Sequence, residues 1–263
     1  MRLNDFLRTV GKQIKTPNFL ISRVLDRLQP YDIGFPLLRV GPAGDGGYLL
    51  PDIDLSRLQA AFSPGVASEC GFERELSERF NVPAIMVDGS VEAPVNLPHD
   101  AIFEKVWLGR KTSVNSIGLK DLVVKYVGND NRKLLLQMDI EGAEYKIIPF
   151  VSMKTVKRFE IIVIELHYLH RMSYLVKFLT EFFPTIMKLT SSHQVIHVHA
   201  NNCCGQVTFG SRSSPEVIEV TLLRRDLFTE IGIKANLPHS LDRDCVPEKA
   251  SISAAIMWEV ESE

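Results

Sequence analysis

Several features that define whole classes of protein are missing from this sequence of 263 residues. No apolar run approaches the roughly 18 residues of a membrane-spanning helix, so we expect no integral membrane segment. The opening residues lack the basic region, apolar core and small-residue cleavage site of a secretory signal. The formal net charge of -2 gives no reason to expect a nucleic acid partner. Together these absences favour a cytoplasmic protein.

Cysteine is scarce, and its spacing is uninformative for metal or disulfide chemistry. The chain has only Cys70, Cys203, Cys204 and Cys245. Two are adjacent and none forms a C-x-x-C pair, so the pattern indicates neither a disulfide framework nor a zinc knuckle. We therefore assign no metal ligands from the sequence.

The glycine-rich phosphate-binding motifs are missing as well. Neither G-x-G-x-x-G nor G-x-x-x-x-G-K-[ST] occurs, which argues against a P-loop kinase and against a pyrophosphate site. An adenosine ligand without phosphates fits the sequence better.

The chain begins with a segment unlike the rest. Apolar residues from Leu3 to Ile14 recur at helical spacing, with basic residues largely elsewhere on the wheel. Such a helix could cap the domain, contact a second copy of the chain, or touch a membrane surface. We expect an N-terminal helical extension over residues 1–36 and a single α/β domain over residues 37–263.

That domain alternates between two periodicities. Apolar runs at 58–65, 83–90, 102–109, 133–140 and 159–167 predict buried strands. Helical patterns follow at 70–80 and 117–127, from about Ala143, and at 172–183, where Pro184 is expected to stop the helix. Such alternation indicates a mostly parallel sheet with both faces covered. The last strands, 194–200 and 216–225, lack a helix between them, which predicts an antiparallel excursion.

The carboxyl ends of these strands carry the polar residues, and parallel sheets bind ligands there. Gly65 follows the first strand and allows close backbone approach. Asp88 ends the second strand, about 23 residues later, an offset at which an acid can accept hydrogen bonds from a ribose diol.

Acids and imidazoles end the later strands. Asp139 follows one strand, and Glu165 and His167 end the next. His197 and His199 are two apart, so they face one side of a strand. We expect Asp139, Glu165, His167 and His199 to converge above the sheet, because buried ionisable groups are costly unless they are paired. Glu144 is expected only to start a helix, where an acid suits the helix dipole.

The segment "LLLQMDIEGAEYKII" resembles the signature of the FkbM-type methyltransferases, in which a hydrophobic strand leads into D-[IV]-E-G-[AG]-E. Three neighbouring segments also resemble elements of that family: "FSPGVASECGFERELSERFNVPAIMVDGSV", "GPAGDGGYLLPD" and "LPHSLDRDCVP". The resemblance covers roughly residues 40 to 250. It implies a Rossmann-like, seven-stranded class I methyltransferase fold and S-adenosylmethionine-dependent O-methylation of a sugar, glycan or natural product.

The resemblance also implies roles for the strand-end residues. The loop from Ser63 through Gly65 to Ser68 would pass under the methionine part of the cofactor, Asp88 would hold the ribose, and Asp139 would lie near the sulfonium. Gly46 and Gly47, with Asp45 and Tyr48, would form a lid edge or only a turn before an edge strand. One departure from the family pattern is that this first cofactor motif is poor in glycine. It has Ala67 and Ser68 where many relatives of the wider superfamily carry small residues or glycine.

Methyl transfer to an alcohol needs alignment and benefits from a base. We expect His167 to be that base, His199 to be the second candidate, and Asp139 to orient the base or replace it. Two other readings stay open. One is a metal-dependent hydrolase or oxygenase using Asp139, Glu165, His167 and His199. The other is a binding module that kept the fold without the reaction.

Overall fold

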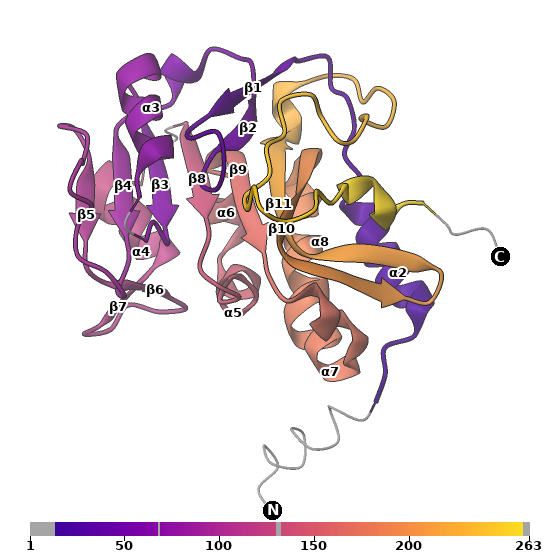
Figure 1. Cartoon of the computed structure of the whole chain (residues 1–263). Coiled ribbons are helices and arrows are strands. Elements are labelled where there is room, and N and C mark those ends of the chain that lie inside the picture. Colours follow the sequence, from indigo (N-terminus) through magenta and orange to yellow (C-terminus); the bar gives the residue numbers. More distant parts are fainter. Residues whose placement is uncertain (1–13, 68, 130–132, 260–263) are drawn as a thin grey trace, which may run out of the picture.

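A single seven-stranded sheet runs through the protein, in the order β10-β11-β9-β8-β3-β4-β5 (Figure 1). The computed structural model describes residues 14–67, 69–129 and 133–259. The strands are β3 (Ala60–Pro64), β4 (Ala84–Val87), β5 (Ile102–Glu104), β8 (Leu134–Met138), β9 (Phe159–Leu166), β10 (His193–Phe209) and β11 (Arg212–Arg224). Adjacent strands are parallel except at β11, which is antiparallel to both β9 and β10. The predicted mostly parallel sheet with an antiparallel excursion is confirmed.

Over the described ranges, two short two-stranded sheets accompany the main one. β1 (Leu37–Val40) and β2 (Tyr48–Pro51) form an antiparallel hairpin, and β6 (Trp107–Gly109) pairs with β7 (Ser116–Gly118). The prediction of one strand over 102–109 is wrong, because β5 and β6 belong to different sheets. The amide of Val106 donates to the carbonyl of Glu104, a tight turn that breaks the strand.

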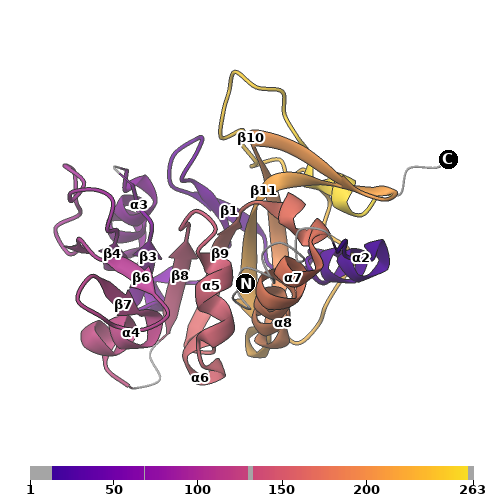
Figure 2. The ribbon, with the colours of Figure 1, turned by 90° about the horizontal axis from the view of Figure 1, so that it is seen from below.

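Helices cover both faces of the main sheet (Figures 1 and 2). They are α2 (Asn18–Arg27), α3 (Gly71–Phe80), α4 (Leu119–Val127), α5 (Glu144–Ile147), α6 (Met153–Val156), α7 (Leu175–Lys177) and α8 (Phe183–Ser192). Pro184 does not stop the predicted helix at 172–183. A π-helical stretch (Phe178–Phe182) leads directly into α8, and Pro184 lies in the first turn of α8, where a missing N–H needs no partner.

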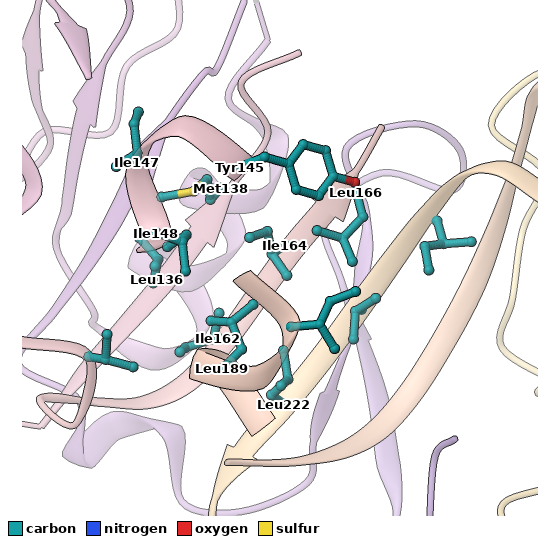
Figure 3. Packing of buried hydrophobic residues seen from close by; sticks show 14 of the residues in the cluster. Leu136, Met138, Tyr145, Ile147, Ile148, Ile162, Ile164, Leu166, Leu189 and Leu222 are labelled. Carbon is teal, nitrogen blue, oxygen red and sulfur yellow. The ribbon is translucent and has the colours of Figure 1, made fainter. Parts of the chain in front are cut away.

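The sequence of β8 shows how the sheet is buried on both sides. Leu134, Leu136 and Met138 belong to one apolar cluster, on which α5 and α8 pack (Figure 3). Leu135 points to the opposite face, into a second cluster with residues of α3 and of the β1–β2 hairpin. Successive side chains of a strand alternate between faces, so a continuous apolar run is needed where both faces are covered.

The chain before β1 takes part in this core. Ile21, Val24 and Leu25 of α2 are buried in the same cluster as the leucines of β8, and the indole of Trp258 donates to the carbonyl of Leu25 at 3.0 Å. The predicted amphipathic helix falls almost entirely on residues 1–13, outside the described residues, so its role in self-association or surface contact stays a prediction. Within the described parts of the chain, no helix is long and apolar enough to cross a membrane.

The C-terminal segment after β11 folds back over the β10–β11 side of the sheet. Asn202 of β10 fixes it by accepting from the amide of Val246 and donating to its carbonyl, both at 2.9 Å. The next residues along β10, Cys203 and Cys204, are joined by a disulfide. That bond links neighbours in sequence and was not predicted from the cysteine pattern.

Candidate functional site

The ends of β3 and β8 touch each other at the carboxyl edge of the sheet. The amide of Asp139 donates to the carbonyl of Pro64 at 3.2 Å. Gly65 has a φ of +82°, and a Cβ placed there would lie 1.6 Å from the carbonyl oxygen of Asp139. Glycine is therefore required at this position by the close approach of two backbones. The resulting corner holds Asp139 in place.

The segment after Asp139 turns sharply toward the end of β9. Glu141 and Gly142 both have positive φ, +55° and +86°. A Cβ on Gly142 would lie 2.8 Å from the ring of Tyr168, so the turn packs directly against the residue that follows His167. The turn carries Glu144, whose side chain is completely buried, back under the imidazole of His167.

Four carboxylates surround His167. Nδ1 lies 2.9 Å from Oε1 of Glu144. Nε2 lies 3.5 Å from Glu141, 3.6 Å from Asp139 and 3.7 Å from Glu165, distances that are long for hydrogen bonds but short enough for attraction once the ring is protonated. A proton on Nδ1 donated to Glu144 leaves Nε2 as the basic nitrogen that faces the strand ends.

The acids shift one another's pKa values. Burial lowers the pKa of His167, but the hydrogen bond to Glu144 and the neighbouring carboxylates outweigh burial, so the pKa is raised overall. Burial raises the pKa of Asp139 to about 6. Burial and the charge of Asp139 raise the pKa of Glu165 well above its usual range. In the described part of the chain no hydrogen-bond donor reaches the buried Oδ1 of Asp139, so this oxygen can accept a hydrogen bond from a bound ligand.

The predicted ribose-binding residue, Asp88, lies at the end of β4. Its carboxylate is largely buried and accepts from the amide and hydroxyl of Ser90, at 2.7 Å and 2.6 Å. It also accepts from the amide of Ala67 at 3.2 Å. Asp88 therefore shapes the loop that follows β3. Its longest bond, to Ala67, is the one that a ligand hydroxyl can most easily replace.

The remaining predicted cofactor residues lie around this loop. Ser63 is buried on β3, beside the buried side chain of Glu73 in α3. Ser68 falls outside the described residues. Gly46 and Gly47 form the turn of the β1–β2 hairpin, and a Cβ on Gly47 would lie 2.0 Å from the carbonyl oxygen of Pro42. The same proline would lie 3.0 Å from a Cβ on Gly71, so this turn reaches the first residue of α3.

Tyr48, which follows the glycine pair, is deep in the structure. Its ring is 5 % exposed and packs edge-on against Phe72, and its hydroxyl accepts from the amide of Gln137 at 3.1 Å. Burial raises the pKa of Tyr48 strongly, and nearby Glu219, Asp139 and Glu165 raise it further. The phenol thus lies among the strand-end acids.

His199 belongs to a separate group on β10. In the sheet register it is opposite Glu219, which is in turn opposite Glu165. His199 and Glu165 are thus two strands apart, roughly 10 Å at normal strand spacing. The expected convergence therefore holds for Asp139, Glu165 and His167, whereas His199 lies beside Glu219, Asp242 and Cys245.

Several members of both groups were not predicted from the sequence. Glu144 was expected only to start a helix, but its carboxylate orients His167. Glu219 was hidden inside a strand pattern, and Asp242 and Cys245 lie in an irregular segment. The resemblance of "LPHSLDRDCVP" to a family element was the only signal that pointed to these last two.

Comparisons with known proteins find a matching family and similar solved structures. The family "Methyltransferase FkbM domain" matches residues 46–194. A search of curated proteins finds no significant match. Among solved structures, the fibrillarin/Nop5p complex is similar with 11% identity and a TM-score of 0.38, over 74% of this chain and 98% of that one. A mutant of the 16S rRNA (adenine(1408)-N(1))-methyltransferase from Catenulisporales acidiphilia gives 8% identity and a TM-score of 0.32, over 72% and 97%.

Proposed function

This chain belongs to the FkbM methyltransferase family, and we propose that it transfers a methyl group from S-adenosylmethionine to a hydroxyl of a sugar, glycan or natural product. The observation that carries the proposal is His167. Glu144 fixes one nitrogen of its ring, and the other nitrogen faces Asp139 and Glu165 at the carboxyl edge of the sheet. This is the edge at which such sheets bind ligands.

His167 is suited to remove a proton from an acceptor hydroxyl. The Glu144 contact selects the tautomer with a free Nε2 and holds the ring in one orientation. Glu144, Asp139 and Glu141 stabilise the imidazolium that forms when Nε2 takes the proton. Most of the rate must come from alignment of the acceptor oxygen, which the rigid contact between Gly65 and Asp139 supports.

The residues present fit S-adenosylmethionine. Asp88 would hold the ribose hydroxyls, and the loop from Gly65 to Cys70 would pass along the methionine part. The unpartnered Oδ1 of Asp139 would accept a hydrogen bond. When bound, the cofactor supplies an activated methyl group, and the chain supplies orientation and the base.

Cofactor binding is the first test. We expect S-adenosylhomocysteine to raise the melting temperature of the protein, since a ligand that binds only the folded state stabilises it. Calorimetry should give at least tenfold weaker binding for Asp88→Ala. Asp52→Ala, at an exposed site, is the matched control and should bind normally. If the wild-type protein binds no S-adenosylhomocysteine, the result would favour a binding module that kept the fold without the reaction.

The second test addresses the base. Wild-type protein is incubated with S-adenosylmethionine and a panel of hydroxylated glycans, and methylated products are detected by their mass. With an acceptor from that panel, His167→Ala should lower turnover at least 100-fold and leave calorimetric binding of S-adenosylhomocysteine nearly unchanged. The exposed His99→Ala is the control. Wild-type turnover in His167→Ala would remove His167 from the mechanism.

One observation favours a second candidate, a metal-dependent hydrolase or oxygenase. Asp139, Glu141 and His167 offer ligand atoms that all lie within 4.8 Å of one another. Carboxylates with an imidazole suit divalent ions. Loss of all activity on chelation, with no cofactor binding in calorimetry, would support this candidate over methyl transfer.

A further inference from the structure

We propose that His199, Glu219 and Cys245 form a binding site for a zinc ion, separate from the His167 group. The three residues come from β10, from β11 and from the C-terminal segment that crosses them. An imidazole nitrogen, a carboxylate oxygen and a sulfur from these residues all lie within 4.8 Å of one another. No single stretch of the sequence contains this combination.

His199 supplies the first independent observation. Its side chain is only 9 % exposed, and Nε2 is buried without a hydrogen-bond partner among the residues that the structure describes. A buried polar atom without a partner is costly. A metal ion would satisfy it, because a neutral imidazole nitrogen is a common zinc ligand.

The carboxylate of Asp242 lies beside the other nitrogen of the His199 ring. Oδ1 of Asp242 is 3.7 Å from Nδ1 of His199, a distance for electrostatic attraction that is long for a hydrogen bond. The same oxygen accepts from Nε2 of His197 at 2.9 Å, and Oδ2 accepts from the amide of His239 at 2.8 Å. Metal-binding histidines usually have their second nitrogen held by such a carboxylate.

Glu219 and Cys245 face each other directly. The thiol of Cys245 donates to Oε1 of Glu219 at 3.3 Å, and the strand register places Glu219 directly opposite His199. The two hydrogen bonds between Asn202 and Val246 hold the neighbour of Cys245. The ligands are therefore preorganised, and binding requires mainly loss of the thiol proton.

The chemistry of the set favours zinc over magnesium or calcium. A thiolate and an imidazole are softer ligands than the oxygen donors that magnesium and calcium prefer. The surroundings are mainly acidic, with Asp45, Asp242 and Glu165 nearby and Arg39 as the opposing cation. Three protein ligands leave one tetrahedral position for water or another oxygen. The ion would also tie the C-terminal segment to the sheet.

The test uses full-length protein stripped with a chelator and then titrated with Zn²⁺ and with Co²⁺. We expect one ion per chain, and a cobalt–thiolate charge-transfer absorption in the near ultraviolet. Cys245→Ser should abolish that absorption, whereas Cys70→Ser, at the other free cysteine, should retain it. Asp242→Asn should weaken Zn²⁺ binding by about 10- to 100-fold.

Several results would overturn the proposal. One is no stoichiometric ion in the wild-type protein. Another is a thiolate absorption that survives Cys245→Ser, or cobalt binding that is lost in Asp139→Asn and unaffected by His199→Gln. If Cys245→Ser does not fold, His199→Gln and Glu219→Gln test the same ligand set, and folding of each variant is checked by circular dichroism.

Discussion

Replacement of Gly65 by alanine gives a quantitative test of the contact between β3 and β8. The new Cβ would lie 1.6 Å from the carbonyl oxygen of Asp139, whereas real Cβ contacts are essentially never shorter than 3.0 Å. The neighbour is backbone and cannot rotate away, so the end of β8 must move. Two costs then add: alanine at positive φ, about 1–2 kcal/mol, and overpacking, about 1–3 kcal/mol.

A matched control separates these two costs. Gly34 has a φ of +81°, close to the +82° of Gly65, but a Cβ there would meet no described residue within 4 Å. Gly34→Ala should therefore lower the free energy of unfolding by about 1–2 kcal/mol, and Gly65→Ala by about 2–5 kcal/mol. Urea unfolding followed by circular dichroism measures both values.

The same substitution should also disturb the site. Movement of Asp139 by about 1 Å costs on the order of 100-fold in a reaction that depends on alignment, and calorimetric binding of S-adenosylhomocysteine should weaken as well. Equal destabilisation by Gly65→Ala and Gly34→Ala would refute the reasoning, because it would mean that the backbones of residues 65 and 139 do not pack as closely as described.

Three further substitutions test the packing and the buried polar groups. Burial lowers the pKa of His193 to about 4, from the usual value near 6.5, so only the unfolded state binds the extra proton between these pH values. The free energy of unfolding should fall by up to about 3 kcal/mol as the pH drops from about 6.5 to about 4. In urea titrations His193→Gln should flatten this pH dependence, whereas the control His99→Gln, at an exposed site, should keep it. Leu122→Ala, at a fully buried position of α4, should cost about 2–5 kcal/mol in the same assay, and a loss below about 1 kcal/mol would contradict close packing there. Thr221→Val removes the 2.8 Å hydrogen bond from β11 to the carbonyl of Leu49 in the β1–β2 hairpin. This leaves a buried acceptor unpaired and should lower the free energy of unfolding by about 1–3 kcal/mol. No change would show that the hairpin is held by other contacts.

The sequence was sufficient for the fold class because periodicity and burial follow the same rules along every strand. The run from Leu134 to Met138 could be identified as a central strand, because a strand covered on both faces is apolar at most consecutive positions and the run is too short for a typical buried helix. The ends of individual strands and helices were harder to predict. The strand predicted over 102–109 splits because of one tight turn, and Pro184 is accommodated by a π-helical stretch. Such local solutions depend on packing that single residues do not reveal.

For the site, the sequence by itself determined which acids and imidazoles stand at strand ends, since a parallel sheet delivers its carboxyl ends to one edge. Asp139 and His167 could be placed there for that reason. Only the tertiary structure decided their partners: Glu144 reaches His167 through a turn with positive φ, and His199 joins Glu219 through the sheet register and Cys245 through a returning C-terminal segment. Register and chain reversal depend on contacts between residues far apart in the sequence, and periodicity within one segment cannot encode them.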